Sequence, residues 1–188
     1  MVESEAEGGV LKTYVLEGDA LDGYERGDLS YTYYVRDLDD LTTPRLPHGF
    51  TAHTVGPDDF AARVAVHRAV WAPSRVTEDV YRHVMQTWPY RPDLDCVVEA
   101  PNGTFAAYVL CWYDDANRVG ELEPVGTHPS FRRQGLGAAA CAYALTRLRD
   151  AGAEQAIVYA KEPPARALYE SVGFRRHTSA LELRRLLP

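Results

Sequence analysis

Three β-rich segments in close succession, residues 94–99, 104–113 and 119–127, constrain the fold more than any other feature of the sequence. The first two are joined by Ala100-Pro101-Asn102-Gly103, and an Asn-Gly pair is typical of a tight hairpin turn. The third segment begins just after a second turn, at residues 114–117. Strands joined by such short turns pair with their neighbours, so the sequence predicts an antiparallel meander.

A helical pattern at residues 135–150 follows the meander. Leu136, Ala140, Ala144 and Leu148 recur every four residues, which gives this helix one apolar stripe, and its alanines allow close approach to a sheet. Turn and capping signals predict further elements before and after this core. These are a strand at 50–55, helices at 57–71 and 77–88, a strand at 156–160, a helix at 163–173, and one or two strands at 174–183. The pattern is that of a mixed α/β domain.

Residues 1–48 differ from the rest of the chain. A Gly/Asp-rich stretch is followed by an aromatic, strand-like run at residues 29–38, and then by Pro44 and Pro47, which disfavour regular structure. We expect a hairpin or a single strand followed by a linker, and a flexible extension is the alternative. The sequence therefore suggests two parts, an N-terminal extension at residues 1–48 and a folded domain at residues 49–188.

Composition argues against several classes of protein. No apolar run approaches the roughly 20 residues that a membrane-spanning helix needs, and the acidic N-terminus lacks the core of a secretory signal, so we expect a cytoplasmic protein without a membrane partner. A net charge of −7 is unsuited to nucleic acid, although it suits a cationic substrate. The 3 cysteines form no CxxC pair, so neither a disulfide framework nor a metal site is predicted.

The loop at residues 132–138 has the composition of an anion site. The first N–H groups of a helix have no partners within it, and the helix dipole favours negative charge there. Gly135 and Gly137 allow close approach to the backbone, and Arg132 and Arg133 add positive charge. Glycines of this spacing also occur in plain tight turns. They match the GxGxxA form of a dinucleotide fingerprint as well, although seven residues separate Thr127 from Gly135.

Two motifs together carry a resemblance to a known family. Arg132-Arg133-Gln134-Gly135-Leu136-Gly137 fits Arg/Gln-x-x-Gly-x-Gly/Ala, and residues 165–174 fit A-x-x-L-Y-x-x-x-G-F. With the intervening helix and strand, residues 50–183 resemble the GNAT superfamily of N-acetyltransferases. The resemblance implies a GNAT-like mixed, largely antiparallel sheet flanked by helices. It also implies that acetyl-CoA is a co-substrate, and that an acetyl or other short acyl group passes directly to a primary amine of a small molecule or peptide.

The resemblance also implies roles for individual residues. Tyr169 matches the tyrosine that protonates the departing thiolate, although it also fits as a packed aromatic residue. Glu121 and Glu123 alternate onto one face of a strand, where the family often places a general base, although a plain surface role is the alternative. The expected contacts of acetyl-CoA are Val125, Gly126 and Thr127 for the pantetheine, and Arg132, Arg133, Gln134, Gly135, Leu136, Gly137 and Ala138 for the pyrophosphate.

One departure from the family pattern favours a different function. Many members carry Asn where this chain has Glu162, and that Asn helps to hold the pantetheine. A CoA-binding regulatory module without catalytic turnover is therefore the alternative to an acyltransferase. The acceptor pocket is expected in the helical segment at residues 58–90, which is rich in aromatic side chains. These are Trp71, Tyr81, Trp88 and Tyr90.

The aromatic run at residues 31–38 resembles the last strand of a preceding half in tandem members of the family. The chain would then be the C-terminal half of such a protein, with a leftover strand. An unpaired aromatic strand is prone to aggregate unless it is covered. We therefore expect this strand to pair with a partner sheet, which favours a homodimer.

Overall fold

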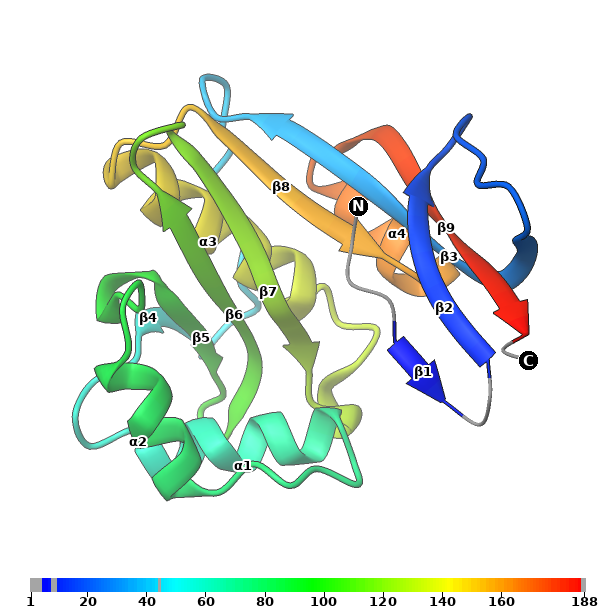
Figure 1. The fold of residues 1–188 in the computed structure, drawn as a ribbon. Helices are drawn as coiled ribbons and strands as arrows, with labels where there is room; N and C mark the ends of the chain where they lie inside the picture. The colour runs from blue at the N-terminus through cyan, green and yellow to red at the C-terminus, as the bar shows by residue number, and fades with distance from the viewer. Residues whose placement is uncertain (1–4, 8–9, 44, 187–188) are drawn as a thin grey trace.

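A computed structural model describes residues 5–7, 10–43 and 45–186 of the chain. Its centre is a 9-stranded sheet in the order β1-β2-β9-β3-β8-β7-β6-β5-β4 (Figure 1). The sheet is antiparallel except where β7 pairs with β8, which confirms the expected mixed, largely antiparallel architecture. The strands are β1 (Glu5–Glu7), β2 (Val10–Leu16), β3 (Glu25–Asp37), β4 (Thr51–Thr54), β5 (Asp95–Glu99), β6 (Phe105–Asp114), β7 (Val119–Thr127), β8 (Gln155–Ala160) and β9 (Arg175–Leu186).

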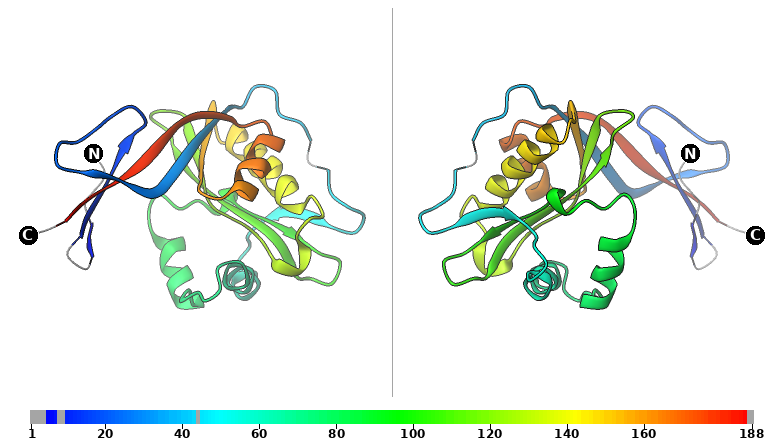
Figure 2. Two further views of the ribbon diagram at one scale, coloured as in Figure 1. Left: turned by 90° about the vertical axis from the view of Figure 1, so that its right-hand side faces the viewer. Right: turned by 90° about the vertical axis from the view of Figure 1, so that its left-hand side faces the viewer.

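Two pairs of helices flank the sheet on opposite faces (Figure 2). One face is covered by α1 (Phe60–Val70) and α2 (Glu78–Gln86), and the other by α3 (Leu136–Asp150) and α4 (Pro163–Ser171). The apolar stripe of α3 is buried as predicted, because its small residues let the helix lie directly on β5, β6 and β7. The helix α2 begins where Thr77 accepts a hydrogen bond from the N–H of Val80 (3.2 Å).

The meander predicted from the sequence is confirmed, and β7 has the expected bounds. A bulge interrupts it, because Val109 pairs with Val125 whereas Cys111 pairs with Leu122. The extra residue in β7 reverses the alternation of its side chains, so each residue after the bulge faces the side of the sheet opposite to the one that regular alternation would give. Leu122 packs into the core under α3, whereas Gly126, an even number of residues later, faces α1.

The parallel pairing between β7 and β8 is short. It runs from Val119 opposite Gln155 to Glu121 opposite Ile157, and the two strands separate beyond that point. The backbone groups of residues 122–127 that point toward β8 therefore have no partner strand among the described residues. Backbone N–H and C=O groups need hydrogen bonds, so this edge can accept other partners. This separation creates an opening in the sheet beside the start of α3.

The N-terminal segment is built into the same sheet. β3 lies between β8 and β9, and β2 pairs with the far side of β9. The expectation of an unpaired aromatic strand was therefore wrong, since β3 has a partner on both sides. β2 and β3 do not form a hairpin with each other, because β9 lies between them, and the last residues form one strand rather than two. The division of the chain at residue 48 remains a prediction.

A buried charged cluster lies beneath α1. Arg63 and Asp95 are 2% and 0% exposed, and Arg63 Nε lies 2.9 Å from Asp95 Oδ1. The hydroxyl groups of Tyr81 and Tyr90 donate to the other carboxylate oxygen, Oδ2. The guanidinium of Arg63 also stacks on Tyr108, 3.9 Å from the ring centroid. These contacts tie α1 and α2 to β5 and β6.

Within the described ranges, no helix has the length and apolar character required to cross a bilayer. The same residues contain no group of three or more His, Cys, Asp or Glu side chains that could hold a metal ion. Cys96, Cys111 and Cys141 are buried free thiols, and burial raises the pKa of each.

Candidate active site

The loop at residues 132–138 begins the helix α3 with an unusual backbone. A short 3-10 helix, Pro129–Phe131, follows β7, and the Nδ1 atom of His128 accepts a hydrogen bond from the N–H of Ser130 (3.2 Å). Arg133 has φ +64° and Gly135 has φ +78°, both in the left-handed region. For Arg133 this conformation is costly, and such strain is common where a backbone is shaped for a ligand.

The N–H groups of this loop are available to a ligand. Ala139 donates to the carbonyl of Gly135 (3.0 Å), but the N–H groups of residues 133–138 donate no hydrogen bond within the described part of the chain. A Cβ on Gly137 would lie 2.7 Å from Thr127 Oγ1, so a glycine is needed to bring the start of α3 against the end of β7. The exposed side chains of Arg132 and Arg133 lie beside these donors. Together, the unpaired donors and the positive charge make this loop chemically suited to binding an anion.

The strand residues expected to contact a cofactor lie at the opening between β7 and β8. Val125 and Thr127 follow the bulge, and Gly126 lies between them in contact distance of α1. A Cβ on Gly126 would lie 2.6 Å from the Tyr108 ring and 2.9 Å from Val70. A larger residue would therefore displace either β7 or α1. The structure brings these three residues and the loop at 132–138 to the same end of β7.

Tyr169 on α4 is 6% exposed and packs against Tyr34 and Phe174, with ring centroids 6.5 and 5.9 Å away. Its hydroxyl makes no hydrogen bond within the residues that the structure describes. Burial, together with the nearby Tyr159 and Glu123, raises the pKa of Tyr169 well above its ordinary value. The hydroxyl therefore keeps its proton at neutral pH. Both readings of this residue agree with the structure, since a packed ring can carry a reactive hydroxyl.

Glu121 and Glu123 project from the same face of β7, as their alternation predicts. Glu123 Oε1 accepts a hydrogen bond from the Tyr159 hydroxyl at 2.5 Å, and the backbone carbonyl of Glu123 accepts one from Trp112 Nε1 at 2.8 Å. Burial raises the pKa of Glu121, and the nearby charge of Glu123 raises it further. The two glutamates thus lie at the point where β7 and β8 separate, and the Glu123 carboxylate is held there by Tyr159.

Tyr159 and Trp112 had no place in the sequence-based prediction of the site. Tyr159 lies on β8 beyond the last backbone pair with β7, so its contact with Glu123 depends on where the strands separate. Trp112 lies opposite Glu121 on β6. Alternation along these two strands would have placed both side chains on the face of the two glutamates, provided that the register were known.

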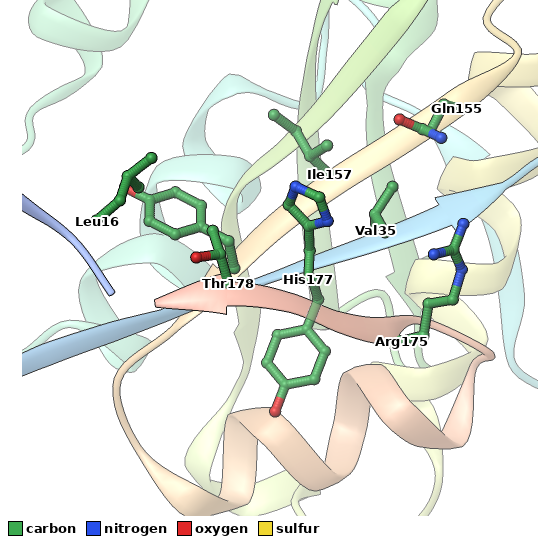
Figure 3. Close-up of a pocket in the computed structure, with 9 residues that line it drawn as sticks. Leu16, Val35, Gln155, Ile157, Arg175, His177 and Thr178 are labelled. Atoms are coloured by element: carbon green, nitrogen blue, oxygen red, sulfur yellow. The ribbon is translucent and has the colours of Figure 1, made fainter. Parts of the chain in front are cut away.

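A hollow of about 560 Å³ lies beside Glu121 on this face. Trp88 and Trp112 form part of its walls, and Ile157 lines both this hollow and a second one of about 340 Å³, which is drawn in Figure 3. The aromatic residues that the sequence assigned to an acceptor pocket lie in different places. Trp88 lines the hollow and is 90% exposed, Tyr81 and Tyr90 bind Asp95, and Trp71 donates a hydrogen bond to Tyr108.

Comparisons with known proteins agree with this geometry. A family model described as the acetyltransferase (GNAT) family matches residues 63–174. Mycothiol acetyltransferase of Streptomyces coelicolor is 30% identical over 153 residues, covering 77% of this chain and 49% of that protein. Mycothiol acetyltransferase of Saccharomonospora viridis is 31% identical over 145 residues, covering 70% and 47%. The chain thus spans about half the length of these two curated relatives.

Solved structures show the same fold. A GCN5-related N-acetyltransferase from Sphaerobacter thermophilus superposes with a TM-score of 0.80 at 18% identity, covering 95% of this chain and 60% of that one. A tandem GNAT protein from the clavulanic acid biosynthesis pathway gives a TM-score of 0.71 at 18% identity, covering 93% and 63%. Because these alignments cover the N-terminal strands as well, residues outside the matched family segment have a counterpart in known folds.

Proposed function

The chain belongs to the acetyltransferase (GNAT) family, and on this basis we propose that it transfers an acetyl or other short acyl group from acyl-CoA to a primary amine, by direct attack in a ternary complex. One observation carries the proposal. Backbone N–H groups that donate no hydrogen bond within the described residues lie at the same end of β7 as the opening in the sheet, and Tyr169 and Glu123 lie close to that opening.

The residues present fit acetyl-CoA. The N–H groups of residues 133–138, with Arg132 and Arg133, would hold the pyrophosphate, and the Gly135 and Gly137 positions keep the backbone accessible. Residues 125–127 would hold the pantetheine along the β7 edge that β8 leaves unpaired. Acetyl-CoA would supply an acyl group activated as a thioester.

Two groups on the open face of β7 would move the proton of the acceptor. An amine is protonated at neutral pH and cannot attack until it loses that proton. Glu123 would accept the proton directly or through a water molecule. Glu121, the second candidate base, has a pKa raised by burial, which makes its carboxylate a stronger base.

Tyr169 would protonate the departing sulfur. A tyrosine hydroxyl carries its proton at neutral pH, and burial, which raises the pKa of Tyr169, extends that range to higher pH. No other residue in the described part of the chain holds that hydroxyl in a hydrogen bond, so it is free to donate.

The acceptor in this proposal is a small-molecule or peptide amine. Asp114, Asp115 and Glu121 line the hollow beside the site together with aromatic residues, a composition that suits a cation. The proposal also includes a cytoplasmic location, supported by the buried free thiols, and no nucleic-acid or membrane partner, supported by the negative charge. The proposal includes a homodimer as well. Its support is that β1 is the last strand at one edge of the sheet, and an edge strand can pair with a strand of a second copy.

The proposal is tested by titrating the protein with acetyl-CoA in a calorimeter and then screening amines, amino acids, aminoglycosides and peptides for turnover. We expect saturable binding of acetyl-CoA, no binding of NAD, and release of free CoA with at least one amine. Tight binding of acetyl-CoA with a flat screen would favour the regulatory module instead. Absence of acetyl-CoA binding would contradict both.

A change at Glu162 is expected to strengthen donor binding. Glu162 is the exposed N-cap residue of α4, and its side chain makes no capping hydrogen bond. In Glu162→Asn, a negative charge near the anionic donor is replaced by a neutral amide, so we expect the Kd for acetyl-CoA to fall about two- to fivefold. Calorimetry measures this, with Glu154→Gln, an exposed acidic residue before β8, as the control. A Kd unchanged or raised in Glu162→Asn would contradict the expectation.

A further inference from the structure

Four tyrosines form one aromatic cluster on the open face of the sheet. Tyr14 comes from β2, Tyr31 and Tyr33 from β3, and Tyr159 from β8. The ring centroids of Tyr31 and Tyr159 are 5.5 Å apart in an edge-to-face arrangement, and those of Tyr33 and Tyr159 are 6.1 Å apart. Tyr14 lies 5.6 Å from Tyr31 on the outer side. The Tyr159 ring is therefore fixed by aromatic contacts from the N-terminal segment, in geometries that aromatic pairs favour.

The other end of Tyr159 crosses the opening in the sheet. Backbone pairing of β7 with β8 ends at Glu121 and Ile157, so the next residues on the same face, Glu123 and Tyr159, face each other where the strands separate. The Tyr159 hydroxyl bridges this gap by donating to Glu123 Oε1 at 2.5 Å. A short bond to a charged acceptor is among the stronger hydrogen bonds in proteins.

We propose that β2 and β3 are part of the catalytic architecture, because their tyrosines fix Tyr159 as the positioning residue of the general base Glu123. This inference rests on the proposed function and concerns residues 10–37, which lie outside the segment 63–174 that the family model matches. A carboxylate at the edge of an opening would otherwise be free to rotate into solvent. The hydrogen bond from Tyr159 on β8 fixes one carboxylate oxygen of Glu123, which leaves the other carboxylate oxygen to accept the proton of the amine.

Several titratable side chains surround the Glu123 carboxylate. Glu121 lies on the same strand, Tyr33 and Tyr159 approach from β3 and β8, and Tyr169 approaches from α4. Among these groups, Tyr159 donates a hydrogen bond to the carboxylate. Removal of this donor therefore takes away the contact that fixes the direction of the carboxylate, and proton transfer from the amine slows.

The decisive variant is Tyr159→Phe, which keeps the ring contacts and removes the hydroxyl. We expect kcat/KM for the amine to fall about ten- to a hundredfold and the Kd for acetyl-CoA to stay unchanged. Tyr31→Leu, which removes a ring contact of Tyr159 but no contact of Glu123, should lower kcat/KM by less. The double variant should lose little more than Tyr159→Phe alone, since both changes act through one hydrogen bond.

Tyr24→Leu is the matched control. Tyr24 precedes β3 in the same segment, and its ring contacts Arg185, 4.8 Å from the centroid, away from Tyr159. Its loss should leave kcat/KM at the wild-type value. Equal effects of Tyr24→Leu and Tyr31→Leu, or a Tyr159→Phe variant that keeps the wild-type kcat/KM, would overturn the proposal.

A measurement independent of turnover separates this inference from the proposed function. Carbon NMR of the side-chain carboxyls compares the Glu123 signal of the wild type, Tyr159→Phe and Tyr31→Leu at one pH, since loss of a hydrogen bond changes the chemical shift of a carboxylate. A displaced Glu123 signal in both variants supports the positioning role even if the wild type acetylates no amine, in which case the proposed function fails alone. An unchanged Glu123 signal overturns the positioning role whatever the rate.

Discussion

Replacing Arg63 with methionine is expected to lower the free energy of unfolding by about 3–5 kcal/mol. Arg63 is 2% exposed and holds Asp95, which is 0% exposed, at 2.9 Å. Methionine has a similar length and fills much of the same space, so the main loss is the partner of a buried carboxylate. Tyr81 and Tyr90 would still donate to that carboxylate, but they carry no charge to offset it. Urea denaturation followed by circular dichroism measures the change.

A second ion pair provides the control for this prediction. Arg82 on α2 forms ion pairs with Glu78 and Asp79, and its side chain is half exposed. Because solvent screens such pairs, Arg82→Met should cost no more than about 1 kcal/mol. A loss below about 1 kcal/mol in Arg63→Met would show that the buried pair contributes no more than the exposed one.

Replacing Tyr169 with phenylalanine is expected to reduce kcat about a hundred- to a thousandfold, which is the usual loss when a positioned proton donor is removed. Phenylalanine preserves the ring contacts with Tyr34 and Phe174, so the Kd for acetyl-CoA and the stability should change little. Stopped-flow measurement of CoA release, with an amine found in the screen, gives kcat directly.

Tyr34→Phe is the matched control for Tyr169→Phe. It removes a hydroxyl from the same aromatic group, but that hydroxyl donates to Glu170 (3.1 Å) rather than being free. We expect kcat to remain within about twofold of the wild type, since no proton donor is lost. Similar losses of kcat in both variants would mean that Tyr169 acts only by packing, and full activity of Tyr169→Phe would exclude a role in proton transfer.

The sequence predicted the parts of the fold that depend on local signals. Hairpin turns, helix caps and apolar spacing are read within a few residues, and β7 and α3 lie where these signals placed them. The proposed anion site at residues 132–138 was predicted in the same way, because its glycines and arginines lie next to one another in the chain. The proposed role of Tyr169 was predicted from its resemblance to a motif on a single helix.

The parts that depend on distant pairing could not be predicted. β3 enters the sheet through contacts with β8 and β9, more than a hundred residues later in the chain, and no local pattern indicates those partners. The same holds for Tyr159 and Glu123, which meet because β7 and β8 separate at one residue pair. Pro124 inside a predicted strand was the available signal, since a proline there often marks a bulge.

The place of β9 between β2 and β3 governs the order in which the protein forms during its synthesis. Thr32 pairs with Ser179 and Val10 with Leu186, so the N-terminal strands leave the ribosome long before their partners exist. Until then, the tyrosine-rich β3 exposes apolar surface and unpaired backbone, which are hazards in a nascent chain. Such long-range closure slows folding. The pairing of β2, and of one edge of β3, can consequently form only after β9 has been made.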